Sequence, residues 1–198
     1  MVSFSESLSP ALKGLFKALE ESPMVSYIVD ANLQIKYCNA AWDRFAQQND
    51  APELVRDRML GLDLRTVLGD DLRPYYLRAF AEAEKSGKVW ECLYECSSPD
   101  RFRKFHMRLH PLQPQGCFLI TNALVIEAPH SEAVAADPNE YLTSNSAIAM
   151  CCHCRRSRSA LSLDRWDFVP AHVKRGFHNI SHSLCPLCLE YFYPRPEN

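Results

Sequence analysis

Two CxxC pairs near the end of the chain constrain its folding more than any other feature. Cys151 and Cys154 form the first pair, Cys185 and Cys188 form the second, and 30 residues separate the two pairs. A tight turn in each pair brings two thiolates to one cation, and two such turns complete the tetrahedral sulfur set that Zn²⁺ accepts. Four sulfurs leave no position for water, so the spacing predicts a structural zinc ion and not a catalytic one.

Neighbouring residues leave alternatives for this metal shell. His182 lies three residues before Cys185, where we expect it to hydrogen-bond a thiolate from outside the shell; the alternative is that it replaces a cysteine as ligand. Cys152 and His153 lie inside the first turn, where the central residues usually point away from the metal, so a ligand role for them is less favoured. A redox or disulfide role is also less favoured. A c-type haem is excluded because Arg155, and not histidine, follows the first CxxC.

The segment that carries these cysteines has few large aliphatic residues. So short a segment does not easily build a self-sufficient core, whereas structural zinc contributes about 10 to 16 kcal/mol in small peptides. We therefore expect metal binding and folding of this segment to be coupled. Its small core is predicted around a hairpin or short helix, from Trp166, Phe168, Val169 and Val173.

Charge and cysteine use both change near residue 149. Residues 1–149 carry 15 basic and 20 acidic side chains, a net charge of −5, whereas residues 150–198 carry 7 and 4, a net charge of +3. The stretch 128–147 between them is small and polar, contains two prolines and has no sustained period. We predict an N-terminal amphipathic helix in 1–23, a main domain in 24–127, a linker in 128–147 and a zinc-binding module in 148–198.

The main domain shows strand and helix signals in a definite order. Two short β-prone runs, 24–29 and 35–38, flank turn residues and predict a hairpin. Asn39 can cap one helix, and Asp70 or Asp71 a second helix that has Pro74 in its first turn and stops at Gly87. Three strands are predicted at 89–96, 102–112 and 117–126. Strands joined by short turns pair antiparallel, so we expect an α+β fold with helices covering one face of the sheet.

Side-chain alternation assigns faces to the last three strands. One side of the first of them carries Trp90, Cys92, Tyr94 and Cys96, and one side of the second carries Phe105, Met107 and Leu109; both sets are expected to face the helices. A ligand pocket, if the domain has one, is expected to be lined by Trp42, Phe45, Tyr76, Phe80, Trp90, Tyr94 and Met107. Aromatic residues at such spacings more often form a filled core, so no ligand is named.

From Met24 to about Glu127, roughly half of its length, the chain resembles a PAS domain. The resemblance is carried by YIVDANLQIKYCNAAWDRFA, a hairpin followed by an Asn-led helix with an aromatic residue, then by GLDLRTVL and the three closing strands. It implies a five-stranded antiparallel sheet with a helical flank, often enclosing a small-molecule pocket. It also implies a role in signalling through changed contacts with a neighbour.

A second resemblance links the two halves. CSSPDRFRKFHMRLHPL, the later MCCHCRRSR and then SHSLCPLCLEYFYP are similar to bacterial proteins that couple a PAS domain to a compact double-CxxC module. The resemblance implies a PAS fold followed by a small module of zinc-ribbon or treble-clef type.

Cofactors that other PAS domains hold are not predicted. Haem needs an axial ligand such as histidine, and no histidine precedes His106; the Asn-Cys-Arg-Phe run of flavin-binding relatives is also missing. Cys92 and Cys96 share a strand face that Cys117 can approach across the sheet. We interpret these three cysteines as small buried hydrophobic residues in preference to a redox sensor.

Basic residues cluster in the small module. Arg155, Arg156 and Arg158 follow the first CxxC, and Arg165, Lys174 and Arg175 lie further on. Such a cluster can bind phosphates, so nucleic-acid binding is the alternative to a solvated or protein-binding face. A net charge of +3 without a recognition-helix pattern favours the protein-binding face.

The remaining signals concern location and output. The longest apolar stretch is about ten residues, short of the roughly 18 that a bilayer requires, and the N-terminus lacks the pattern of a secretory signal. We therefore expect a cytoplasmic protein with no membrane partner. Enzyme motifs are missing, so we expect a non-enzymatic signalling or adaptor protein that acts on a protein partner. A homodimer is a further expectation, because the first helix carries an apolar stripe at Leu8, Leu12, Leu15, Phe16 and Leu19.

Overall fold

The computed structural model describes residues 10–113, 116–130, 137–174 and 179–194. Leu8 of the predicted apolar stripe and Arg175 of the basic cluster lie outside these ranges. Within these ranges no helix combines the length and the apolar character that crossing a membrane requires.

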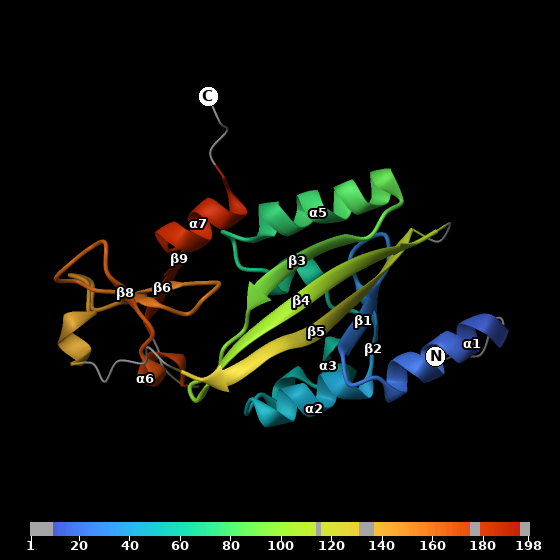
Figure 1. Cartoon of the computed structure of the whole chain (residues 1–198), viewed down its shortest axis with the longest axis horizontal. Helices are drawn as coiled ribbons and strands as arrows, with labels where there is room; N and C mark the ends of the chain where they lie inside the picture. Colours follow the sequence, from blue (N-terminus) through green and yellow to red (C-terminus); the bar gives the residue numbers. More distant parts are fainter. Residues whose placement is uncertain (1–9, 114–115, 131–136, 175–178, 195–198) are drawn as a thin grey trace. The chain divides into compact units, whose positions relative to one another are not determined.

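A five-stranded sheet lies at the centre of the first two thirds of the chain (Figure 1). Its strands are β1 (Val25–Val29), β2 (Ile35–Cys38), β3 (Trp90–Glu95), β4 (Arg101–Leu112) and β5 (Cys117–Pro129), in the spatial order β2-β1-β5-β4-β3. β1 lies between β2 and β5 and pairs antiparallel with both. This sheet and its helical flank have the architecture expected of a PAS fold, so the predicted fold class is confirmed.

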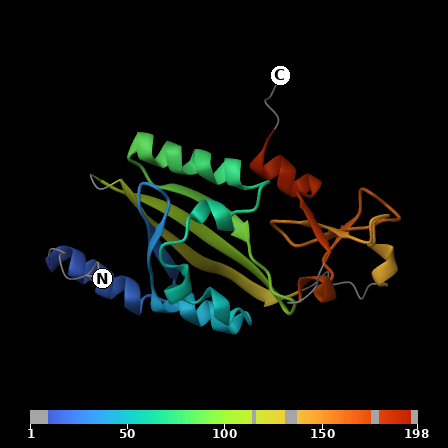
Figure 2. The same ribbon diagram turned by 180° about the vertical axis from the view of Figure 1, so that it is seen from behind.

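The helical flank comes from the chain between β2 and β3. It consists of α2 (Ala40–Gln48), the 3₁₀ turn η1 (Pro52–Leu54), α3 (Arg56–Met59), α4 (Leu64–Val67) and α5 (Arg73–Ser86). Figure 2 shows the short helices of this flank in front of the sheet. α5 ends before Gly87, whose φ of +65° lies in the left-handed region that glycine adopts without a Cβ clash. The helix therefore stops where the sequence predicts.

Successive residues of the sheet pack on opposite layers, as strand geometry requires. The Tyr27 ring meets Trp42 of α2 with centroids 5.3 Å apart, and Phe118 meets Phe80 of α5 at 5.0 Å. The next residues along these strands, Ile28 and Leu119, form a cluster with Leu19 of α1 (Pro10–Glu21). The helical flank therefore covers one face of the sheet, and α1 packs on the other.

Asn39 joins this first helix to the strands. Its Oδ1 accepts hydrogen bonds from the backbone N–H groups of Ser26 (3.0 Å) and Trp42 (3.2 Å), so it caps α2 as predicted. Its Nδ2 donates to the carbonyl oxygens of Leu19 and Met24, at 2.8 Å each. One buried amide therefore connects the end of α1, the start of β1 and the start of α2.

The cysteine-rich end of the chain forms a second, smaller sheet. β6 (Ile148–Cys151), β7 (Ser157–Arg158), β8 (Trp166–Asp167) and β9 (Ile180–Ser183) lie in the order β8-β7-β6-β9. β6 pairs antiparallel with β7 and parallel with β9. Two short helices, α6 (Pro170–Val173) and α7 (Pro186–Phe192), complete it, and the 3₁₀ turn η2 (Pro138–Glu140) precedes it.

The core of this module includes a residue from the stretch expected to be a linker. Tyr141 is fully buried against Ile148 and Val169, and its hydroxyl donates to Asp167 at 2.6 Å. Phe168 and Val169, both predicted as core, are buried, whereas Trp166 and Val173 are half-buried. The core of the module is therefore small, as the composition of the segment indicates, and it includes Tyr141 from the stretch before the first strand of the module.

Residue contacts group the chain into two compact units. The first contains residues 1–68, 79–92 and 106–123, and the second contains 69–78, 93–105 and 124–198. The second unit thus includes the cysteine module together with the start of α5, the β3–β4 connection and the end of β5. Contacts between those segments and the cysteines are contacts within one unit.

Candidate metal centre

The four predicted cysteine ligands come from two kinds of local structure. Cys151 ends β6, and Cys154 lies in the turn that leads to β7. This turn closes through the hydrogen bond from the Arg155 N–H to the Cys151 carbonyl (3.1 Å), with Arg155 at a φ of +62°. Cys185 is the N-cap of α7 and Cys188 lies in its first turn, with Pro186 at the first helical position.

The four sulfur atoms form a compact, buried cluster. All lie within 4.8 Å of one another, the Sγ atoms of Cys154 and Cys185 are 3.7 Å apart, and all four cysteines are free and buried. A Zn–S bond of about 2.3 Å in a tetrahedron gives a sulfur–sulfur separation of about 3.8 Å. A disulfide would need about 2.05 Å. The cluster therefore has the dimensions of a metal site.

The origin of the two pairs distinguishes between the two module types expected. One pair comes from the turn of a hairpin and the other from the first turn of a helix. This arrangement is of treble-clef type, because a ribbon would take both pairs from turns between strands.

Electrostatics within the cluster call for a cation. Hydrogen bonds from the thiols of Cys154 and Cys185 lower the pKa of Cys151. The hydrogen bond with Cys151 raises the pKa of Cys154 and also that of Cys188. The four thiols cannot all ionise without a cation, because each thiolate repels the others and raises the pKa of the remaining thiols. A divalent cation at their centre removes this opposition, so the donor set fits a metal such as Zn²⁺.

His153 lies between the cluster and a strand of the large sheet. Its Nδ1 is 3.3 Å from the Sγ of Cys188, and its Nε2 is 3.1 Å from the backbone nitrogen of Glu95 at the end of β3. The Glu95 N–H donates to Nε2, so the neutral ring carries its proton on Nδ1 and donates it to the sulfur. Burial lowers the pKa of His153 and so favours this neutral ring.

Arg156 makes a second link between the same parts of the unit. Its guanidinium hydrogen-bonds Cys154 and lies 3.7 Å from the carboxylate of Glu95. Burial raises the pKa of Glu95. A sulfur cluster with four thiolates around one divalent cation carries a net negative charge, which Arg156 partly offsets.

The other residues considered for the shell lie outside the cluster. Cys152 is half-buried, and burial raises its pKa to about 11, so it is a thiol at neutral pH. His182 lies in β9 with its side chain exposed. The histidine that the structure brings to a sulfur is His153, which the sequence reasoning expected to point away. The parallel pairing of β6 with β9 and the packing of the His153 ring on Phe192 (4.7 Å) set its direction, and neither is visible in the spacing.

The predicted basic face is divided among different environments. Arg155 is exposed, Arg156 is half-buried against Glu95, and Arg158 is half-buried in β7. Further on, Arg165 pairs with Glu140 and Asp167. Two of these charges, Arg156 and Arg165, therefore have acidic partners, and a basic contact face at Arg155, Arg156 and Arg158 stays a prediction.

The residues predicted to line a PAS pocket pack against other rings. Tyr76 and Phe80 are buried, while Trp42, Phe45, Trp90, Tyr94 and Met107 are half-buried. Tyr94, for example, stacks on Phe105 with centroids 5.5 Å apart. Packing of this kind fills space, so a ligand pocket among these residues stays a prediction.

The three cysteines considered for redox sensing are all free thiols. Cys92 is buried, and Cys96 and Cys117 are half-buried. Burial raises the pKa of Cys96 and of Cys117. A raised pKa lowers the fraction of thiolate, the form that reacts with oxidants, so these two thiols are less reactive than an ordinary cysteine.

Comparison with known proteins gave only structural similarities. No protein-family model and no curated protein sequence matches the chain. The PAS domain of a two-component sensor histidine kinase has 18% identity and a TM-score of 0.40, covering 58% of this chain and 96% of its own. The PAS domain of nitrogen regulation protein NR(II) from Vibrio parahaemolyticus has 16% identity and a TM-score of 0.39, covering 56% and 97%. A PAS domain from Colwellia psychrerythraea has 11% identity and a TM-score of 0.46, covering 58% and 97%.

Proposed function

We propose that this chain is a non-enzymatic cytoplasmic signalling or adaptor protein, in which a PAS domain is coupled to a structural zinc module that presents a protein-binding surface. The observation that carries the proposal is the cluster of four buried cysteine sulfurs within 4.8 Å of one another. With four protein ligands, such a centre has no open position for a substrate, so its role is structural.

The contacts around the cluster support coupling to the PAS strands. His153 donates to Cys188 and accepts from the backbone of Glu95, while Arg156 contacts both Cys154 and the Glu95 carboxylate. A change in how the metal is held would therefore alter the hydrogen bond from His153 and the ion pair from Arg156 to Glu95 at the end of β3. In the same way, a shift of β3 would change the contacts of His153 with Cys188 and of Arg156 with Cys154.

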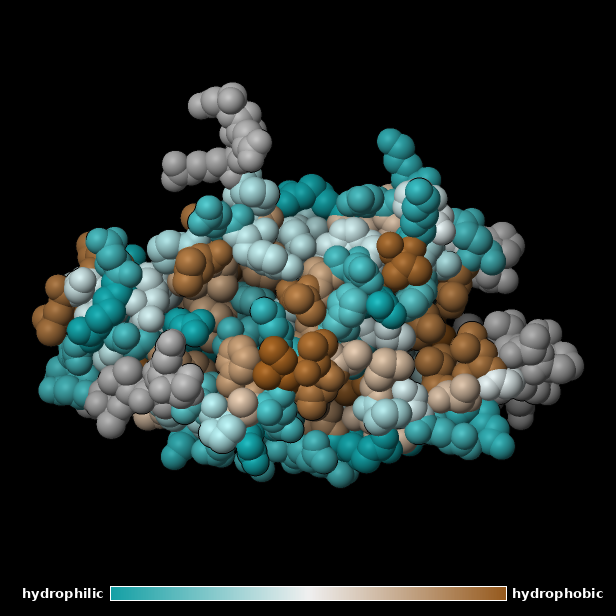
Figure 3. Space-filling view, in the orientation of Figure 1, coloured by the Kyte–Doolittle hydropathy of each residue, from teal (hydrophilic) through white to brown (hydrophobic). Residues whose placement is uncertain are grey.

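Exposed hydrophobic side chains of the second unit support a protein partner. Leu124, Val125 and Ile126 follow one another along β5, and hydrophobic surface is visible among hydrophilic residues in Figure 3. Leu187 and Tyr191, one turn apart on α7, are 75% and 53% exposed. Leu187 and Tyr191 share one face of α7, and neighbouring exposed apolar side chains of this kind are typical of protein interaction sites. Nucleic-acid binding is less supported, because Arg156 and Arg165 already have acidic partners.

Metal analysis of the natively purified chain tests the proposal. We expect one zinc ion per chain by elemental analysis and native mass spectrometry, with no organic ligand. Cys185→Ser should remove the metal and unfold the module, because three ligands hold zinc far less tightly than four. Cys152→Ser is the matched control, since Cys152 lies outside the cluster. A metal-free chain with a compact C-terminal module would contradict the proposal.

A further inference from the structure

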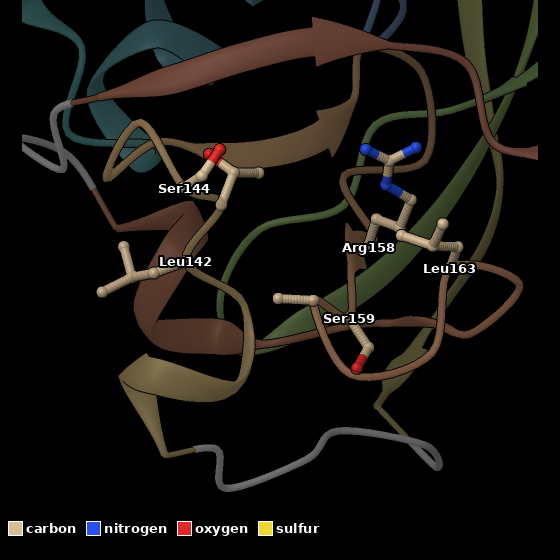
Figure 4. A pocket seen from close by; sticks show the side chains of 7 residues that line it. Leu142, Ser144, Arg158, Ser159 and Leu163 are labelled. Atoms are coloured by element: carbon tan, nitrogen blue, oxygen red, sulfur yellow. The ribbon is translucent and has the colours of Figure 1, made fainter.

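A pocket of about 370 Å³ lies in the C-terminal module, apart from the sulfur cluster. Seven residues from two segments line it: Leu142, Thr143, Ser144, Arg158, Ser159, Ala160 and Leu163. Figure 4 shows Leu142 and Ser144 on one side of it and Arg158 and Leu163 on the other. Its volume is in the range of small-ligand sites, which also accommodate a side chain or two of a bound peptide.

Among the described residues, Arg158 is the only charged one that lines this pocket. The residue is half-buried, and among the described residues no carboxylate lies within ion-pair distance of its guanidinium. Arg165 in the same module shows the contrast, because it pairs with Glu140 and with Asp167 (2.7 Å). A half-buried guanidinium gains most from an anionic partner with which it can make a bidentate pair.

The walls of the pocket are held by their own hydrogen bonds. Ser159 accepts from the backbone N–H groups of Leu161 and Ser162, at 3.2 Å each, which closes the loop between β7 and β8. On the other side Thr143 donates to the Ala147 carbonyl at 2.8 Å. Because both walls are tied down, the pocket is formed before a ligand arrives, which lowers the entropic cost of binding.

The lining specifies the chemistry of the ligand. One cation matches one carboxylate better than a doubly charged phosphate, which would need a second basic group. Leu142, Ala160 and Leu163 provide apolar surface beside that cation. A ligand that fits therefore carries a carboxylate next to an aliphatic group.

We propose that the pocket binds an acidic segment of a protein partner, with a Glu or Asp carboxylate on Arg158 and a neighbouring aliphatic side chain between Leu142 and Leu163. A peptide is favoured over a free small acid because apolar surface continues beyond the pocket. In the same loop, Leu161 is 80% exposed and Leu163 is 66% exposed. The inference rests on the protein-binding role proposed above and names the surface and the partner chemistry.

Binding of short peptides to the full chain tests this inference. The probe is acetyl-Ala-Leu-Glu-Leu-Ala-amide, titrated while backbone amide signals are followed by NMR. We expect saturable shifts at the residues lining the pocket, and binding about tenfold weaker for the peptide with Gln in place of Glu, the effect of one charge-assisted hydrogen bond. Arg158→Gln should weaken binding of the Glu peptide by the same factor. Arg155→Gln removes an equal charge from an exposed arginine outside the pocket and should leave the affinity within twofold.

A second variant and a second probe make each outcome decisive. Leu163→Ser changes an exposed residue, so it leaves the fold intact, and it should weaken binding about threefold through lost apolar contact. Equal binding of the Glu and Gln peptides, or no saturable shift, would overturn the inference. Tighter binding of free 4-methylpentanoate than of the peptide would overturn the assignment to a protein segment. Zinc is measured on the same sample. A chain that contains zinc but does not bind the peptide would contradict the peptide-binding inference and leave the proposed metal centre intact.

Discussion

At the scale of single residues, His153 shows how one ring can serve both a sulfur cluster and a strand. The backbone of Glu95 occupies Nε2, which leaves the Nδ1 proton for the sulfur of Cys188. A fixed tautomer of this kind orients a metal ligand and disperses its charge. From the sequence alone, His182 would be the expected partner of a cysteine sulfur, because it lies closer to the second CxxC pair along the chain.

Replacing each histidine separately distinguishes these two positions. We expect His153→Ala to weaken zinc retention about 10- to 100-fold, the usual effect of removing a hydrogen bond to a metal ligand. His182→Ala should retain zinc as the parent chain does, because its side chain is exposed on β9. The measurement is competition with a chromogenic chelator at neutral pH. Loss of zinc in the His182 variant alone would assign the supporting role to that residue.

At the scale of elements, α1 is attached to its own domain by both apolar and polar contacts. Phe16 packs edge-on against Tyr37 with centroids 5.0 Å apart, and Leu19 joins the cluster with Ile28. Glu20 accepts hydrogen bonds from the Tyr37 hydroxyl and from Arg56, at 2.8 Å each. Phe16 and Leu19 of the apolar stripe therefore pack against the sheet of the same chain. These contacts do not call for a second chain, and homodimerisation stays a prediction.

The attachment of α1 predicts a pH-dependent contribution to stability. Partial burial alone would raise the pKa of Glu20, but the hydrogen bonds from Arg56 and Tyr37 outweigh it and lower the pKa below its ordinary 4.5. A depressed pKa in the folded state stabilises the fold above pH 4.5, and this contribution is lost as the pH falls through the folded value. Glu20→Gln should therefore lower the free energy of unfolding at pH 7 by about 1 kcal/mol or less, since the pair is well exposed.

Urea unfolding at pH 7 and at pH 2.5 measures this effect. The difference between the parent chain and Glu20→Gln should shrink towards zero at the lower pH, where the parent carboxyl is protonated as well. Glu21→Gln is the control on the same helix, because the pairing of Glu21 with Lys17, at 4.0 Å, is weak and exposed. An equal loss at both pH values would show that the substitution acts through packing.

At the scale of the whole molecule, the two compact units depend on different stabilising interactions. The first unit has an apolar core of its own, with Val29, Ile35, Leu109 and Ile120 all nearly inaccessible to solvent. The module in the second unit has short strands and a small core around Tyr141 and Ile148. Its cysteine cluster must therefore supply much of the stability of the module.

Removal of metal should consequently loosen the two units unequally. We expect a chelator to raise amide hydrogen exchange in β6, β9 and α7, where the cysteines are anchored, by about 100-fold or more. Exchange in β1, β2 and α2 should change little, and zinc added back should restore protection. Unchanged protection of β6 and α7 in the metal-free chain would show that the module folds without the metal.

Local patterns in the sequence were sufficient for the order of the elements. Asn39 before a helix, Gly87 after one and the alternation of side chains along parts of β3 and β4 each act over a few residues, so they can be read without knowing the fold. The spacing of the two CxxC pairs acts in the same way, because a turn of four residues brings its own two sulfurs together. The class of the fold and the four cysteines of the cluster follow from such short-range chemistry.

Long-range contacts decided what surrounds the cysteines. His153 contacts Cys188, 35 residues further along the chain, and Arg156 contacts Glu95, 61 residues before it. Tyr141 enters the core of the module and donates a hydrogen bond to Asp167, 26 residues away. No local sequence pattern predicts these partners, because a polar side chain in a turn or linker can be hydrated as readily as it can pair with a distant residue. Only the packing of strands from distant parts of the chain selects one partner and excludes water from the others.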